Sequence, residues 1–133
     1  IFNVGIFGMV NTFHEKVYKE RGVKFYGEFY SDLEYDETGY LVIAKGRNKY
    51  YPTDRAVERC LRAMNENKVK TVQGNDVVVG CETICVHSDT PNAVEILKAL
   101  REKISSDKKI PQKTSNGNHT KMPYIVDKKW KKF

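Results

Sequence analysis

Three short apolar runs predict three β-strands. In each of them, apolar side chains either alternate with polar ones or follow one another without a break, as they do in strands. The runs span residues 2–7, 23–30 and 83–87. Within the second run, Phe25 and Phe29 share one face of the strand, and Glu28 and Tyr30 share the other.

Between and after these strands, apolar residues return every three to four positions, which predicts three amphipathic helices. The helices span about 11–21, 53–67 and 91–104. Their expected buried faces are Phe13 and Val17 in the first helix, Val57, Cys60, Leu61 and Met64 in the second, and Val94, Leu97, Leu100 and Ile104 in the third. Gly22 suits a C-terminal cap, and Thr90 and Pro91 suit a helix start.

Short links join the first strand, the first helix and the second strand, and such a βαβ unit places its two strands parallel and adjacent. Residues 31–52 are polar and turn-rich, with a turn expected at 36–39 and a short extended piece at 40–43, and a segment of this length is typical of an active-site loop or an excursion from the fold. Residues 69–79 predict a β-hairpin. The predicted fold class is therefore α/β, with three main parallel strands, flanking helices and a small β-hairpin. So few strands leave two open sheet edges, which favours a piece of a larger domain.

The formal net charge of +6 arises in the last part of the chain. Residues 105–133 hold eight lysines against two aspartates, so residues 1–104 are neutral as a group. A neutral body argues against a nucleic-acid-binding fold, and the basic segment predicts at most weak, salt-sensitive contacts with nucleic acid. We expect 105–133 to be a flexible, solvated tail whose one apolar cluster is Tyr124 to Val126.

Several classes of protein are disfavoured by what the sequence lacks. No apolar run approaches the roughly 20 residues of a membrane helix. Three cysteines, an odd number, favour a reduced, cytoplasmic setting over a disulfide framework, and we expect Cys60 and Cys85 in the core. No phosphate-binding glycine loop, zinc-type cluster or serine nucleophile elbow is present.

Polar residues follow the third strand, at the edge where parallel α/β sheets bind their ligands. His87 is suited to act as a general base near neutral pH, or its ring is a structural feature held by a backbone carbonyl. Asp89 is suited to orienting His87 or to binding a metal ion, or it caps the following helix. A divalent ion at His87 and Asp89 is chemically feasible, but no ligand spacing predicts one.

The end of the second strand supplies two further candidates. Glu28 and Asp32 are expected at the same edge as His87, where both are candidate catalytic carboxylates. A buried pair between Glu28 and Lys24 explains the first carboxylate equally well. Lys45 in the loop and Thr90 at the helix start are candidate contacts for substrate or phosphate, although a loop lysine is commonly just solvated.

Two segments resemble the LamB/YcsF family, whose bacterial members act as the A-type subunit of the ATP-dependent 5-oxoprolinase. Residues 85–93, CVHSDTPNA, are similar to the family's Cys-Val-His-Gly-Asp-Thr-Pro-Gly-Ala. Residues 22–42 are similar to its Gly-Leu segment with Glu-x-Phe-Ala-Asp-Arg-x-Tyr, followed by a turn and Gly-x-Leu-Val. The resemblance extends over about residues 2–104 and leaves the tail out.

The resemblance implies that residues 1–104 are the C-terminal half of a (β/α) barrel. The implied activity is that of a hydrolase for a cyclic amide, the ring opening of 5-oxo-L-proline to L-glutamate, with ATP shared with B- and C-type partner subunits. The chain departs from the family at four positions, with Leu33 and Ala44 in place of arginines and Ser88 and Asn92 in place of glycines. These departures favour an alternative, a catalytically inactive fragment that serves as a binding or scaffold protein.

Overall fold

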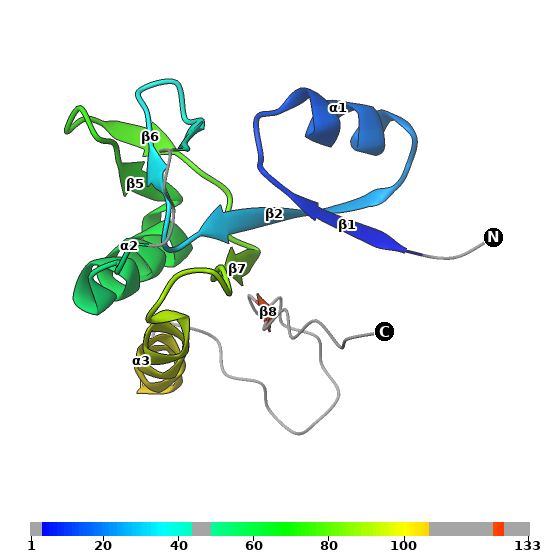
Figure 1. Cartoon of the computed structure of the whole chain (residues 1–133). Coiled ribbons are helices and arrows are strands. Elements are labelled where there is room, and N and C mark those ends of the chain that lie inside the picture. The colour runs from blue at the N-terminus through cyan, green and yellow to red at the C-terminus, as the bar shows by residue number, and fades with distance from the viewer. Residues whose placement is uncertain (1–3, 44–48, 107–123, 127–133) are drawn as a thin grey trace.

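The computed structural model describes residues 4–43, 49–106 and 124–126. Within them, a parallel sheet in the order β1-β2-β7-β8 is accompanied by three helices and two short antiparallel hairpins (Figure 1). The sheet consists of β1 (Gly5–Gly8), β2 (Lys24–Tyr30), β7 (Thr83–Cys85) and β8 (Tyr124–Val126). The helices are α1 (Phe13–Glu20), α2 (Thr53–Glu66) and α3 (Ala93–Ser106). The hairpins pair β3 (Glu34–Tyr35) with β4 (Leu41–Val42), and β5 (Lys68–Lys70) with β6 (Asp76–Val78).

The three predicted parallel strands are confirmed, and their register is staggered. β1 pairs with the first part of β2, from Lys24 to Gly27, whereas β7 pairs with the second part, from Glu28 to Tyr30. The carboxyl end of β2 therefore lies beside β7 and beyond the end of β1. The described strands form an open sheet, and closure into a barrel is not seen in this part of the chain.

Two elements were not anticipated from the pattern. The residues Tyr124–Val126, which we expected in a flexible tail, form β8 and pair in parallel with β7. In the segment 31–52, the predicted turn at Asp36 to Gly39 and an extended piece within 40–43 are present, and the pairing of that piece with β3 forms a hairpin that was not predicted. Strands of two or three residues leave too few positions for an alternation to be recognised, because their pairing is decided by tertiary contacts.

α1 has the predicted ends but not the predicted buried face. The Thr12 hydroxyl accepts a hydrogen bond from the N–H of Glu15, and Gly22 takes the left-handed conformation of a C-terminal cap. None of the residues of α1 is fully buried, and the Phe13 side chain is 74% exposed. The expectation that Phe13 packs in the core is wrong for the described residues, in which this helix of two turns contacts β2.

The core lies between the sheet and the helices α2 and α3, which pack against each other. Phe29, Ile84 and Cys60 are completely buried there, and Cys85 is nearly so, as expected. The predicted buried face of α3 needs one correction, because Val94 is 65% exposed. α3 instead buries Ala93, Ile96 and Leu100, while Leu97 and Ile104 lie at the margin. Among the described helices, none has both the length and the apolar character that crossing a bilayer requires.

Two glycines allow the segment after β1 to cross the sheet closely. A Cβ atom at Gly27 would lie 2.7 Å from Cγ1 of Val10, and a Cβ atom at Gly80 would meet the same methyl group even more closely. Gly27 is also fixed by Glu82, whose carboxylate accepts its N–H at 2.8 Å and whose own N–H donates to its carbonyl. Val10 therefore occupies space that side chains at 27 and 80 would need.

The buried face of α3 predicts different stabilities for two substitutions on the same helix. Ile96→Ala is expected to lower the free energy of unfolding by about 2–5 kcal/mol, because it leaves a cavity between α3 and the sheet. The matched change Val94→Ala is expected to stay within about 0.5 kcal/mol of the parent protein. Urea unfolding followed by circular dichroism measures both, and equal losses would contradict this orientation of the helix.

Candidate functional site

The carboxyl ends of β2 and β7 are tied together just before the candidate residues begin. Beyond the end of β2, the N–H and the hydroxyl group of Ser31 both donate to the carbonyl oxygen of Cys85, at 3.0 and 2.8 Å. Ser31 is fully buried, so this link is shielded from water. It brings the next residue, Asp32, to the same edge of the sheet as His87, which follows β7.

The carboxylate of Asp32 is the centre of the candidate site. Its Oδ1 atom lies 2.7 Å from Nδ1 of His87. Its Oδ2 atom accepts the backbone N–H of His87 at 3.1 Å and the hydroxyl of Thr90 at 2.5 Å. The carboxylate side chain is completely buried, whereas the His87 side chain keeps 21% of its surface exposed. The structure therefore brings together three of the predicted residues, Asp32, His87 and Thr90.

The hydrogen bonds around Asp32 determine its protonation. Burial by itself raises the pKa of Asp32, but the hydrogen bonds from His87 and Thr90, together with the charge of His87, outweigh burial and lower the pKa. Asp32 is therefore ionised at neutral pH and can only accept hydrogen bonds, so Nδ1 of His87 carries a proton. In the neutral ring the lone pair is then on Nε2, which is the arrangement that a general base requires.

Tyr30 and Glu28 lie next to this pair on the polar face of β2. The ring of Tyr30 stacks on that of His87, with centroids 5.9 Å apart and an interplanar angle of 16°. Burial raises the pKa of Tyr30, and the charge and hydrogen bond of Glu28 raise it further, so the phenol stays neutral. We did not single out Tyr30 from the sequence, although its place two residues after Glu28 puts both on one strand face. Lys24 lies over the Tyr26 ring, 4.8 Å from its centre.

The remaining predicted residues differ in their surroundings. Asp89 is exposed in the turn before α3, and Nδ1 of His87 is hydrogen-bonded to Asp32. Lys45 lies outside the described residues.

α3 begins later than predicted, because the N–H of Ile96 donates to the carbonyl of Asn92 and the helix starts at Ala93. Thr90 is buried before the helix, with its hydroxyl directed to Asp32.

Asn92, one of the departures from the family pattern, fixes the segment that leads into α2. Its side-chain oxygen accepts the N–H of Tyr51 at 3.1 Å. Its amide nitrogen donates to the carbonyl of Tyr51 at 2.8 Å and to the hydroxyl of Thr53 at 3.1 Å. The amide side chain thus links the start of α3 to the residues just before and at the start of α2, which a glycine at this position would not do.

The cysteines do not supply a nucleophile. Cys60, Cys81 and Cys85 are all free thiols. Burial raises the pKa of Cys60 well above its usual value and that of Cys81 to about 12, so both thiols stay protonated. Within residues 4–43, 49–106 and 124–126, no three side chains of His, Cys, Asp or Glu are grouped as metal ligands.

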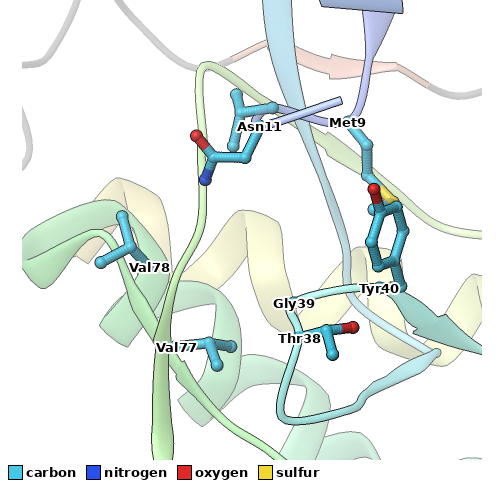
Figure 2. Close-up of a pocket in the computed structure, with 8 residues that line it drawn as sticks. Met9, Asn11, Thr38, Gly39, Tyr40, Val77 and Val78 are labelled. Carbon is cyan, nitrogen blue, oxygen red and sulfur yellow. The ribbon is translucent and has the colours of Figure 1, made fainter. Parts of the chain in front are cut away.

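A hollow lies beyond the carboxyl end of β1, between three segments of the chain (Figure 2). Its volume is about 210 Å³. Its walls come from the segment after β1, the turn between β3 and β4, and β6, and they are formed by Met9, Val10, Asn11, Thr38, Gly39, Tyr40, Val77 and Val78. None of the predicted catalytic residues lines this hollow, so it is separate from the group around Asp32.

The chain is thus an α/β protein with a histidine–carboxylate pair at the carboxyl ends of two parallel strands. Within this class, the chain belongs to the LamB/YcsF family, whose family model matches residues 2–118. It is similar to the 5-oxoprolinase A-type subunit 1 of Pseudomonas putida, with 36% identity over 68% of this chain and 36% of that protein. It is also similar to the 5-oxoprolinase A-type subunit of Oceanobacillus iheyensis, with 32% identity over 78% of this chain and 41% of that protein.

A solved structure agrees with these relatives. The lactam utilization protein from Thermus thermophilus superimposes with a TM-score of 0.67 at 26% sequence identity, covering 77% of this chain and 40% of that one. The fold of the chain is therefore shared with a lactam utilization protein. The chain spans less than half the length of the curated relatives that it matches.

The lowered pKa of Asp32 predicts a dependence of stability on pH. A carboxylate whose pKa is lowered in the folded state stabilises the folded protein fully above its ordinary pKa of 3.8. This contribution is lost as the pH falls from 3.8 through the lower pKa of the folded state. At pH 7, Asp32→Asn is expected to lower the free energy of unfolding by about 1.5–3 kcal/mol. Below pH 3.8, the difference in the free energy of unfolding between Asp32→Asn and the parent protein should narrow.

Urea unfolding at a series of pH values measures this effect. Glu58→Gln, the same type of change at an exposed position on α2, is the matched control and is expected to lie within about 0.5 kcal/mol of the parent protein. A difference between Asp32→Asn and the parent protein that stays constant down to about pH 2 would contradict the ionised, hydrogen-bonded state of Asp32.

Proposed function

We propose that this chain is part of a hydrolase that opens a cyclic amide, 5-oxo-L-proline, to L-glutamate in an ATP-dependent reaction, together with B- and C-type partner subunits. The observation that carries the proposal is the buried Asp32–His87 pair at the carboxyl edge of the sheet. Support also comes from the relatives, which are named as A-type subunits of 5-oxoprolinase. Because the chain spans less than half of their length, we place it as one portion of a (β/α) barrel whose remainder completes the site.

The reaction determines what the site must provide. An amide carbon is a poor electrophile, so ATP transfers its γ-phosphoryl group to the lactam oxygen and leaves as ADP. Water then adds to the ring carbon, and the ring C–N bond breaks as the nitrogen takes up a proton. A second water hydrolyses the resulting acyl phosphate to glutamate and phosphate. The protein must then take a proton from the water and hold the substrate near that base. We assign the removal of the proton from water to this chain. We assign the binding of ATP to this chain and the partner subunits together.

His87 takes the proton from the attacking water at Nε2. Asp32 keeps Nδ1 protonated, which leaves the lone pair of the neutral ring on Nε2 and stabilises the positive charge that develops on the imidazole. The hydroxyl of Thr90 holds Asp32 from the other side, and the stacked ring of Tyr30 restricts rotation of the imidazole. Proton transfer of this kind contributes about 10²–10⁴-fold to a reaction rate.

Three more residues are assigned to substrate contact. The phenol of Tyr30, whose hydroxyl is hydrogen-bonded to Glu28, lies at the same strand end, where its oxygen can accept a hydrogen bond. Asp89 is exposed two residues after His87, where it can reach a bound ligand without leaving the turn. Lys45 is assigned to a phosphate group on the basis of its charge and its place in the loop alone.

The alternative, a scaffold without catalytic activity, is favoured by a different observation. Apolar side chains are exposed on the β1 and α1 side of the described structure, at Val4, Phe7 and Phe13, with exposed fractions of 58, 45 and 74%. Such side chains are typical of a surface that another protein segment covers. A scaffold of this kind would bind partner subunits but would not need His87.

The activity is tested by grafting this chain into the 5-oxoprolinase A-type subunit of Oceanobacillus iheyensis in place of the segment that it matches. With B- and C-type subunits, the graft is expected to form glutamate from 5-oxoproline only when ATP is present. His87→Gln is expected to lower the rate by about 10²–10⁴-fold, because the water loses its proton acceptor. His14→Gln, at an exposed position on α1, is the matched control and should leave the rate unchanged.

Two results would separate the alternatives. A graft whose glutamate formation is insensitive to His87→Gln would overturn the assignment of the general base. A graft that binds the partner subunits but forms no glutamate above background would favour the scaffold.

A further inference from the structure

A buried arginine, Arg59, lies on the face of α2 that packs toward the site. Only 6% of its surface is exposed. Its guanidinium group lies over three aromatic rings, those of Phe29, Tyr35 and Tyr51, at 5.6, 5.8 and 5.6 Å from the ring centres. A charge is costly to bury unless it is well paired, so its position requires an explanation in its contacts.

The contacts of Arg59 surround the turn that carries Asp32. Its Nη1 atom donates to the carbonyl oxygen of Ser31 at 2.9 Å, and its Nη2 atom donates to that of Leu33 at 2.5 Å. One planar group therefore holds the carbonyls of the residues immediately before and after Asp32. The guanidinium group is suited to this because its donors point outward in a rigid fork.

The hydroxyl group of Tyr51 holds the guanidinium group in turn. Nη1 of Arg59 also donates to this hydroxyl at 2.5 Å, and the hydroxyl donates to Glu34 Oε1 at 2.8 Å. Glu34 also pairs with Arg55 at 3.0 Å. The donors of Arg59 are therefore directed by a network that reaches from β3 to α2.

Arg59 bonds the backbone on either side of Asp32, whereas the Asp32 carboxylate itself is hydrogen-bonded to His87 and Thr90. The turn is fixed on one side by the bonds from Ser31 to the Cys85 carbonyl and on the other by Arg59. Between these two supports, the Asp32 side chain is directed to the His87 ring.

We infer that Arg59 is a positioning residue that fixes the turn around Asp32 and, through Asp32, determines which ring nitrogen of His87 is protonated. The inference deepens the proposed function, because the protonation of Nδ1 is what leaves Nε2 free to act as a base. It does not require Arg59 to touch substrate, ATP or a reacting atom.

The test is the tautomer of His87, read from the nitrogen chemical shifts of its ring in the full 133-residue chain labelled with ¹⁵N. Among the neutral forms of the ring, the parent protein is expected to show the Nδ1-protonated tautomer. Arg59→Met removes both carbonyl contacts, and Arg59→Lys keeps the charge but cannot span both carbonyls, so both are expected to give a mixture of tautomers. Asp32→Asn, which removes the ionised acceptor, shows the signal expected when the pair is lost.

Arg62→Met is the matched control, because Arg62 lies one turn further along α2 and pairs at the surface with Asp76 and Glu66. Its His87 signals should equal those of the parent protein. Folded Arg59→Met and Arg59→Lys proteins with unaltered His87 signals would overturn the inference. If neither variant folds, Tyr51→Phe decides, because it removes only the hydroxyl that directs Nη1; a smaller shift toward the mixture supports the inference, and unaltered signals overturn it.

This measurement is independent of the proposed reaction. A loss of the Nδ1-protonated state in the Arg59 variants establishes the positioning role even when the graft forms no glutamate. Conversely, glutamate formation that depends on His87 stands when the Arg59 variants leave the tautomer unchanged.

Discussion

The buried carboxylate of Asp32 links two parts of the chain that are far apart in the sequence. It receives hydrogen bonds from the ring and the backbone of His87 and from Thr90, more than 50 residues away. An ionised carboxylate removed from water is strongly unfavourable unless its oxygens accept hydrogen bonds from nearby donors. The site therefore forms only when β2, β7 and the turn before α3 are all in place. The hydrogen bonds that orient His87 thus depend on the folded arrangement of these elements.

The sequence allowed the edge of the sheet to be predicted, but not the partners within it. Strand direction follows from a short βαβ unit, and it places residues after the second and third strands at a common edge. That rule brought Asp32 and His87 into one neighbourhood. It could not show that Asp32 holds the ring, because Asp89 stands two residues from His87, whereas the true partner is identified only by the register between β2 and β7.

Residues that bond to the backbone left no signal in the sequence. An arginine in an amphipathic helix has the pattern of a solvated residue, yet Arg59 is buried and bonds to main-chain carbonyls, which every residue has. Apolar periodicity failed in the opposite sense at Val94 and Phe13, which are exposed. Periodicity indicates which positions can be buried together, and the neighbouring element decides which of them are. On α3, the packing against α2 favours Ile96 and Leu100.

The close crossing of Val10 over Gly27 and Gly80 has a consequence for how this family can vary. Val10 fills the space that a side chain at 27 or at 80 would need, and both of those positions are glycines. A larger residue at 27 or 80 is therefore compatible with the backbone only in a sequence whose residue 10 is small. We expect the three positions to be substituted as a set across homologues, as a correlated triplet that joins the start of the chain to the hairpin–strand connection. The close packing of this segment on the sheet therefore depends on all three residues together.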